Sequence, residues 1–328
     1  MDTPLGSPYD GEPQVHAATT RRATMRDWII AMLKRRLGKT SLEVTVLGYG
    51  AMELRNEEAP TDEQATRLLN AVLDAGINII DTSPDYGLSE QRIGEAIAHR
   101  RDEYFLATKC GCNVPRADDE DAPRHVWTRS QLLHNIELSL QRMKTDHVDI
   151  WQLHNAGTDD VHEGELLEVM DQVKQQGKVR HVSISSTLPH ISTFIDQGGF
   201  ESYQIAYSAL QRGEENSITA AAESGAGTII RGGVAKGEPD DGLRSNDAWR
   251  IWDKADLDEL RGDGESRTAF LLRFTITHPH MHTTIVGTKN PAHLAENLRA
   301  LDAGPLPSDV YEQAKWRLDE AGQRPAGA

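Results

Sequence analysis

The amino-acid sequence predicts an α/β protein built as a (β/α)8, or TIM, barrel. Two observations support this prediction: the chain contains eight short apolar segments of strand type, and amphipathic segments with helical spacing lie between them. Eight such units favour closure into a barrel over an open sheet. A doubly wound open sheet is the alternative, although no Gly-x-Gly-x-x-Gly motif follows an early strand.

The predicted strands are short runs rich in β-branched and aromatic residues. They are Val46–Ala51, Ile77–Asp81, Tyr104–Lys109, His147–His154, Arg180–Ser185, Ser202–Ala206, Gly227–Arg231 and Thr283–Val286. Helix signals lie between them: Thr61 and Thr128 are N-cap residues, Gly177 follows a helix end, and Pro291 occupies a first helical position. The predicted helices are Asp62–Ala75, Ser89–His99, Arg129–Met143, Gly164–Gln176, Ser217–Ser224, Thr268–Thr277, Pro291–Leu301 and a terminal helix at 307–321.

Composition and charge exclude several functional classes. The chain has 328 residues, and 51 acidic against 35 basic side chains give a net charge of −16. Because so acidic a surface repels phosphate backbones, we expect no nucleic-acid partner. The longest apolar run, Trp28–Leu33, is far shorter than the roughly 20 residues of a membrane-spanning helix, so we expect no membrane partner either.

The N-terminal segment differs in composition from the rest of the chain. Residues 1–20 are rich in Pro, Gly, Thr and Asp without any period, and a basic patch follows them. We predict a disordered extension over 1–34 and one barrel domain over 35–328. The N-terminus lacks the apolar region of a secretory signal, and the chain has only two cysteines, so we expect a cytoplasmic location. The sequence makes no prediction of the oligomeric state.

Polar side chains follow the ends of three successive predicted strands. Asp81 ends the second strand and Tyr86 lies five residues later, while Lys109 ends the third strand and His154 ends the fourth. Because the carboxyl ends of barrel strands meet on one rim, we expect these four side chains to converge. A buried lysine needs a carboxylate partner, which Asp81 supplies. The Lys109 charge would then lower the pKa of Tyr86 from about 10, so that Tyr86 acts as a general acid and His154 orients a substrate oxygen.

These residues and their neighbours resemble the aldo-keto reductase family. The segment Gly76–Thr82 followed by Tyr86-Gly87 is similar to the family's second-strand signature. The Ala-Thr-Lys that ends at Lys109 and the Trp-Gln-Leu-His that ends at His154 are similar to its third and fourth strand ends. The resemblance covers roughly residues 35–302.

This resemblance implies a reaction and a role for each residue. The reaction is the reduction of an aldehyde or ketone to the alcohol, by hydride transfer from NADPH, with Tyr86 as proton donor. Lys109 and Asp81 adjust the acidity of Tyr86, and His154 places the carbonyl oxygen. The segment Arg36–Thr40 resembles the family's short N-terminal β-hairpin. The expected partner is therefore a small-molecule carbonyl substrate.

The resemblance also implies a cofactor site on the same rim. Ser185, Ser186 and Gln204 stand in the place of the carboxamide ligands, and Tyr207 in that of the ring that stacks on nicotinamide. Lys289 lies at a helix N-terminus where it would pair with a 2′-phosphate, which favours NADPH, with NADH as the alternative. The expected cofactor-binding residues are Gly50, Ala51, Met52, Ser185, Ser186, Gln204, Tyr207, Arg231, Gly232, Gly233, Gly287, Thr288, Lys289, His293, Glu296 and Asn297.

Three residues near the predicted strand ends leave choices open. Arg231 either contacts a cofactor phosphate or caps its strand. Cys110 and Cys112 have no histidine partners evident from the sequence, and their spacing is not that of a redox motif, so we interpret them as structural thiols and expect no metal.

Two other functions fit the same barrel pattern. One is a cofactor-binding regulatory subunit on this fold with little turnover. The other is a lyase that forms a Schiff base on Lys109, which the pairing of Asp81 with Tyr86 disfavours.

Overall fold

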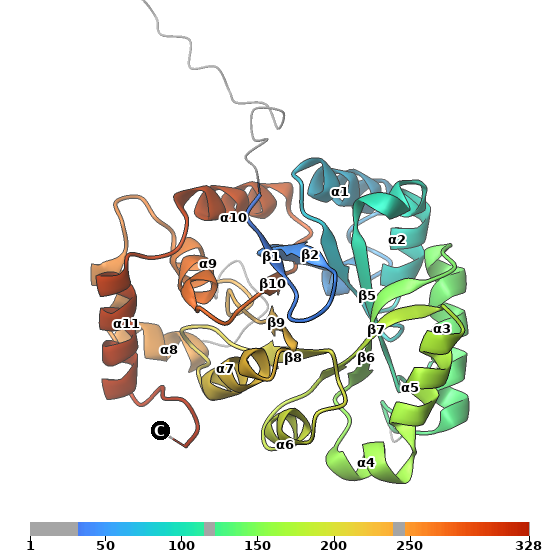
Figure 1. Ribbon diagram of the computed structural model, residues 1–328. Helices are drawn as coiled ribbons and strands as arrows, with labels where there is room; N and C mark the ends of the chain where they lie inside the picture. Colours follow the sequence, from blue (N-terminus) through green and yellow to red (C-terminus); the bar gives the residue numbers. More distant parts are fainter. Residues whose placement is uncertain (1–31, 115–121, 239–246, 328) are drawn as a thin grey trace, which may run out of the picture.

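A closed barrel of eight parallel strands forms the centre of the protein (Figure 1). The computed structural model describes residues 32–114, 122–238 and 247–327. Around the barrel the strands follow the order β10, β3, β4, β5, β6, β7, β8, β9. Their bounds are β3 Leu47–Gly50, β4 Ile79–Asp81, β5 Phe105–Cys110, β6 Val148–His154, β7 Val179–Ser185, β8 Ser202–Ala206, β9 Gly227–Arg231 and β10 Thr283–Val286. The predicted barrel and all eight predicted strands are confirmed.

Helices cover the outside of this barrel. They are α1 Asp62–Asp74, α2 Ser89–Ile97, α3 Arg129–Met143, α4 Thr158–Glu163, α5 Leu166–Gln175, α6 His190–Gln197, α7 Glu215–Glu223, α8 Asp247–Lys254, α9 Arg267–Thr277, α10 Pro291–Ala303 and α11 Ser308–Glu320. The predicted caps are present: Thr61 and Thr128 accept backbone hydrogen bonds at the starts of α1 and α3, and Gly177 follows α5 with a φ of 78°. Helices α4, α6 and α8 were not predicted, because six to eight residues are too few to show a helical period.

A short β-hairpin closes the N-terminal end of the barrel. Its strands β1 Lys34–Arg36 and β2 Glu43–Thr45 pair antiparallel, and Figure 1 shows them in front of the barrel strands. Three apolar residues of this segment pack with four from the barrel interior: Leu37, Leu42, Val44, Ile79, Ala107, Ile150 and Ile229. The side chains of the hairpin therefore fill the N-terminal end of the barrel.

The hairpin also tests the predicted limit of the N-terminal extension. Strand β1 begins at Lys34, so the fold starts within the segment 1–34 that was predicted to be disordered. Residues 1–31 of that extension lie outside the described residues, with three of the six basic residues of the patch at 21–36: Arg21, Arg22 and Arg26.

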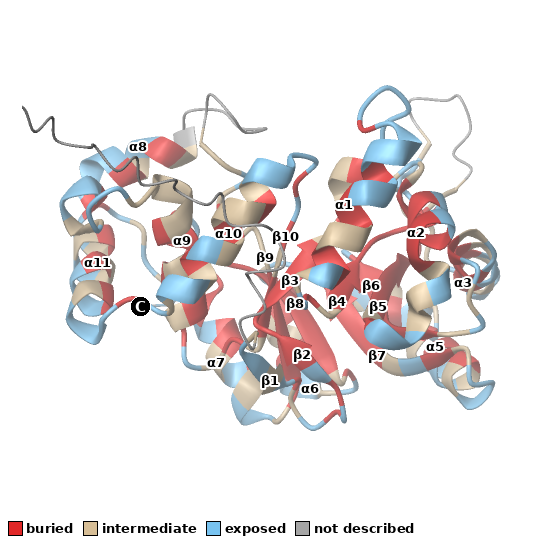
Figure 2. Ribbon diagram, turned by 90° about the horizontal axis from the view of Figure 1, so that it is seen from above, coloured by how far each residue is buried: buried red, intermediate tan, exposed pale blue. Residues whose placement is uncertain are grey.

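Buried residues concentrate in the strands and on the inner faces of the helices, while the outer helix faces are exposed (Figure 2). This pattern is expected where helices shield a parallel sheet from water. In the part of the chain that the structure describes, every helix is too short or too polar to cross a bilayer.

Helices α2 and α3 approach each other at a glycine. Gly94 is buried in α2, and a Cβ atom at this position would lie 2.2 Å from the Arg142 carbonyl oxygen and 2.8 Å from the Met143 carbonyl carbon. Real Cβ atoms do not approach backbone atoms so closely, so only glycine allows this packing.

We expect Gly94→Ala to destabilise the protein by about 1–3 kcal/mol, because the methyl group forces α2 and α3 apart. In a solvent-exposed helix the same change would stabilise the protein by roughly 0.5–1 kcal/mol. The sign of the change in unfolding free energy therefore shows whether the two helices are in close contact at Gly94. The measurement is the free energy of unfolding in urea. Gly213→Ala, where a Cβ would meet no atom within 4 Å, is the control and should change stability by less than about 0.5 kcal/mol. Stabilisation by Gly94→Ala would contradict the packing argument.

Candidate active site

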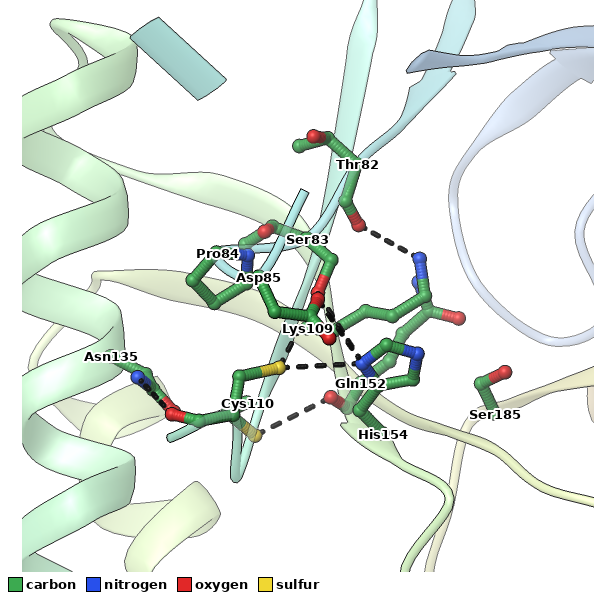
Figure 3. Close-up of polar contacts among 12 residues, drawn as sticks. Thr82, Ser83, Pro84, Asp85, Lys109, Cys110, Asn135, Gln152, His154 and Ser185 are labelled. Carbon is green, nitrogen blue, oxygen red and sulfur yellow. Dashed lines mark hydrogen bonds and ion pairs between the residues drawn. The ribbon is translucent and has the colours of Figure 1, made fainter. Parts of the chain in front are cut away.

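A buried ion pair lies at the centre of the candidate site. Lys109 on β5 is 1% exposed and Asp81 at the end of β4 is 3% exposed. Lys109 Nζ lies 2.6 Å from Asp81 Oδ2 and donates a second bond of 2.8 Å to the Thr82 carbonyl oxygen, as Figure 3 shows for Thr82. Burial alone would lower the pKa of Lys109, but Asp81 and Tyr86 raise it above its usual value, so the ammonium stays charged. The predicted pairing of Lys109 with Asp81 is thus present.

Two side-chain amides hold the second oxygen of Asp81. Gln152 Nε2 on β6 donates to Asp81 Oδ1 at 2.7 Å, and Gln204 Nε2 on β8 donates to the same oxygen at 2.9 Å. Ser185 at the end of β7 donates to Gln204 Oε1 at 2.9 Å. All of these groups are buried. The carboxylate of Asp81 is therefore fixed in orientation, with one oxygen for Lys109 and the other for the amides.

Tyr86 and His154 lie beside this ion pair. Lys109 Nζ is 5.1 Å from the centroid of the Tyr86 ring, and the rings of Tyr86 and His154 are 5.9 Å apart and nearly perpendicular. Tyr86 is held in a turn after β4, where its N–H donates to the Ser83 carbonyl oxygen at 3.0 Å. The structure therefore brings the four predicted catalytic residues together on one rim.

Burial dominates the ionisation of both rings. It raises the pKa of Tyr86, and the charge of Lys109, which acts in the opposite direction, does not compensate. The expectation that Lys109 lowers the pKa of Tyr86 below its usual value is therefore wrong in this structure. A phenol that stays protonated at neutral pH still carries the proton that a general acid donates. Burial, together with the Lys109 charge, lowers the pKa of His154 to about 3, so its imidazole is neutral.

The rim beyond β8 has features that fit an anionic cofactor. Arg231 ends β9, and its buried Nε atom has no hydrogen-bond partner among the described residues. Gly232 follows it with a φ of 77°. A Cβ atom on Gly287 would lie 2.7 Å from the Gly50 carbonyl oxygen, so β3 and β10 end in close backbone contact. An unpaired guanidinium nitrogen and exposed loop backbone are groups that phosphates bind.

The segment after β10 places a helix N-terminus next to this rim. The Asn290 side chain caps α10 by accepting from the Ala292 N–H at 3.0 Å, and Lys289 beside it is exposed. His293 Nδ1 lies 3.5 Å from Thr288 Oγ1. The positive end of a helix favours an anion here.

The other predicted cofactor residues lie just after strand ends or within α10. Ser186 is buried and its hydroxyl donates to the Ala156 carbonyl oxygen at 3.4 Å. Glu296 accepts a hydrogen bond from the Ser266 hydroxyl, and Asn297 is buried in α10. Ala51 and Met52 directly follow β3, and Gly233 lies two residues after the end of β9.

Tyr207 does not fit its predicted role. It is fully buried, its hydroxyl lies 3.2 Å from the Tyr311 hydroxyl, and its ring packs against Phe274 and His278. Phe274 and Tyr311 belong to the outer helices α9 and α11. The prediction that Tyr207 stacks on nicotinamide is therefore wrong, because its side chain leaves the barrel for the helix layer.

Several polar residues of the rim were not predicted from the sequence. Gln152 lies two residues before His154 on β6, so strand alternation alone would have placed both side chains on the same face. Ser83 contacts His154 Nδ1 at 3.3 Å and donates to Asp85. Cys112, which was expected to have no histidine neighbour, has its Sγ atom 3.3 Å from His154 Nδ1. No sequence signal indicated this last contact, because it depends on how the loop after β5 folds.

Comparisons with known proteins agree with this geometry. The model of the aldo/keto reductase family matches residues 46–316. The chain is 28% identical to the uncharacterized oxidoreductase YqkF of Bacillus subtilis, over 83% of this chain and 92% of the relative. It is also 28% identical to a 6-dehydroglucose reductase of Novosphingobium aromaticivorans, over 81% and 90% of the two chains.

A solved structure with the same fold is the holo form of the aldo-keto reductase AKR11C1 from Bacillus halodurans. The TM-score is 0.77 and the identity is 28%, with 87% of this chain and 96% of the other covered. The barrel and the arrangement of the rim residues agree with the family match. The chain belongs to the aldo/keto reductase family, whose members are oxidoreductases that reduce carbonyl groups with nicotinamide cofactors.

Proposed function

We propose that this protein reduces an aldehyde or ketone to the alcohol with NADPH, and that Tyr86 donates the proton. The observation that carries the proposal is the buried Lys109–Asp81 ion pair beside the ring of Tyr86, with a neutral His154 facing that ring. The balanced reaction consumes one carbonyl compound, one NADPH and one proton, and yields the alcohol and NADP⁺.

The four rim residues have distinct tasks in this reaction. When bound, NADPH would supply the hydride for reduction of the carbonyl carbon. Tyr86 holds a proton at its phenolic oxygen and delivers it to the developing alkoxide, which is a much stronger base than a phenolate. The Lys109 charge, fixed by Asp81, stabilises the phenolate that remains. Neutral His154 donates a hydrogen bond to the carbonyl oxygen and orients it.

The remaining rim residues bind the cofactor. Arg231, Gly232 and Gly233 would hold its phosphates, because Arg231 has a buried Nε–H without a hydrogen-bond partner among the described residues and Gly232 adopts a positive φ after β9. Lys289, exposed at the start of α10, pairs with the 2′-phosphate, and this contact makes NADPH the preferred cofactor over NADH. Ser185 and Gln204 lie at the nicotinamide end, next to Asp81.

Tyr86→Phe removes the proton donor and should lower kcat by about 10²–10⁴-fold. NADPH binding should persist, because the hydroxyl is assigned to the reaction and not to the cofactor. The measurements are steady-state reduction of 4-nitrobenzaldehyde and titration of NADPH fluorescence.

Tyr104→Phe is the matched control for this variant. The Tyr104 hydroxyl is buried without a hydrogen-bond partner among the described residues, and it precedes β5 at the opposite end of the barrel from Lys109. Its loss should leave kcat unchanged. Near-full activity of Tyr86→Phe would refute the proton-donor role, and a wild-type protein that binds NADPH without turnover over a broad carbonyl panel would favour the regulatory subunit.

Lys289→Ala should weaken NADPH binding roughly tenfold and leave NADH binding unchanged, because only NADPH carries the 2′-phosphate. Dissociation constants for both cofactors, measured by fluorescence titration, decide this. Lys39→Ala is the control: Lys39 is exposed in the hairpin segment at the closed end of the barrel, where its Nζ donates to the Ser224 carbonyl oxygen. Equal affinities of the wild-type protein for NADPH and NADH would contradict the assignment of Lys289 to the 2′-phosphate.

A further inference from the structure

Four side chains with metal-binding atoms meet at the mouth of the barrel. They are Asp85, Cys112, His125 and His154, and one ligand atom from each lies within 4.8 Å of the others. Only His154 belongs to the proposed catalytic set. Figure 3 shows Ser83, Asp85 and His154 turned toward the same space.

The local structure holds two of these ligands opposite each other. After β5 the chain forms a narrow antiparallel ladder in which Cys112 pairs with His125. Its hydrogen bonds run from Asn113 N to the Arg124 carbonyl oxygen at 2.9 Å and from Val126 N to the Gly111 carbonyl oxygen at 2.8 Å. Gln131 and Asn135 of α3 both donate to the Cys112 carbonyl oxygen, which fixes the backbone of this residue.

The distances within the cluster already approach those of a metal site. Cys112 Sγ lies 3.3 Å from His154 Nδ1, and His154 Nδ1 lies 3.6 Å from Asp85 Oδ1. Bonds of about 2.0–2.3 Å to a tetrahedral zinc ion place its ligand atoms about 3.3–3.8 Å apart. The widest separation of 4.8 Å therefore needs a contraction of roughly 1 Å.

His125 supplies evidence that a partner is missing from the hydrogen-bond network. Its Nε2 atom is buried and has no hydrogen-bond partner among the described residues. The ring stacks on Trp127 at 5.5 Å and meets the His154 ring edge-on at 5.0 Å, so neighbouring rings define its orientation. A buried, oriented and unpaired imidazole nitrogen is costly unless it gains a ligand.

Charge and donor chemistry identify the class of ion. A thiolate and a carboxylate contribute two negative charges, which a divalent cation neutralises, while the nearby Lys109 is already balanced by Asp81. One sulfur, two imidazole nitrogens and one carboxylate oxygen form a donor set that suits Zn²⁺ and Co²⁺ and does not suit Ca²⁺ or Mg²⁺. Asp85 is on the exposed side of the cluster and gives an ion a route from solvent.

We propose that Asp85, Cys112, His125 and His154 form a binding site for one divalent ion of the zinc class. On binding, the Cys112 thiol releases its proton to solvent and forms the metal–sulfur bond, and each neutral imidazole donates a lone pair. No oxidation or reduction is involved. The ion is a ligand of this site and takes no part in carbonyl reduction.

Metal binding should inhibit the enzyme, a consequence that rests on the proposed function. Coordination at Nδ1 draws the His154 ring toward Cys112 and Asp85, away from the position in which it orients a carbonyl oxygen. Displacements of about 1 Å at a positioning group can lower rates by about 10²-fold. Saturating Zn²⁺ should therefore reduce kcat/KM at least tenfold, and a chelator should restore it.

The test measures binding directly, with no cofactor or substrate present. The metal-free full-length protein is titrated with Co²⁺, which reports tetrahedral geometry in its visible spectrum and thiolate ligation through a near-ultraviolet charge-transfer band. Zn²⁺ is then added in competition, and thermal unfolding is followed with and without the metal. We expect one Co²⁺ per chain with both spectral signatures, displacement by Zn²⁺, and a metal-dependent rise in Tm.

Two cysteine variants form a matched pair. Cys110→Ser should keep the charge-transfer band, because Cys110 Sγ contacts the Gln152 carbonyl oxygen and not the cluster. Cys112→Ser should lose it, and the half-buried His125→Gln should weaken Co²⁺ binding at least tenfold while the fold is retained.

Two results would overturn the site: a wild-type protein without a thiolate–cobalt band, or a Cys112→Ser variant that keeps the band and the Tm rise. Because these readouts need no turnover, they stay valid if carbonyl reduction itself is not found. If the protein binds Zn²⁺ and its carbonyl reduction is unchanged by the ion, the predicted inhibition is refuted and the metal site is not.

Discussion

The buried ion pair between Lys109 and Asp81 is the interaction on which the candidate site depends. Taking two charges out of water costs several kcal/mol for each ion unless hydrogen bonds satisfy both. Here Asp81 accepts from Lys109 with one oxygen and from Gln152 and Gln204 with the other. Loss of one partner would leave an uncompensated buried charge, which costs about 3–5 kcal/mol. Strands β4, β5, β6 and β8 are thereby tied together at one end, and the position of the ammonium beside Tyr86 is fixed.

The N-terminal hairpin decides which end of the barrel is available for chemistry. The hairpin fills the N-terminal end of the barrel with the apolar side chains of Leu37, Leu42 and Val44. The polar groups of the candidate site lie at the other end, on the C-terminal rim. There strands β4 to β8 contribute polar side chains, and the parallel register aligns them: Asp81, Lys109, Gln152, His154, Ser185 and Gln204. The ion pair, the neutral imidazole of His154 and Arg231, whose Nε atom has no hydrogen-bond partner among the described residues, thus lie on one rim. The proposed metal ligands lie on the same rim, and His154 belongs to both groups, so carbonyl orientation and metal binding compete for one ring.

At Tyr86 and His154 burial sets the protonation state more strongly than the neighbouring charges do. Lys109 lies 5.1 Å from the Tyr86 ring, yet the pKa of the phenol is raised, since removal from water disfavours the phenolate more than the ammonium favours it. For His154 both effects have the same sign, and the imidazole is neutral. A protonated phenol and a neutral imidazole are the states that an acid and a hydrogen-bond donor require.

The sequence by itself determined the order of the barrel strands and the longer helices, and it indicated that Asp81, Tyr86, Lys109 and His154 meet on one rim. Alternation, helical spacing and strand-end position are local properties of the chain. Tertiary structure decided the rest. The ionisation of Tyr86 depends on atoms from distant segments, and Tyr207 was misplaced because the side-chain direction at a strand end depends on the register and the helix layer. The meeting of Cys112 with His125 and His154 follows from the pairing of the segment after β5 with itself and from its contact with the end of β6, a relation between residues far apart in sequence that no local pattern encodes.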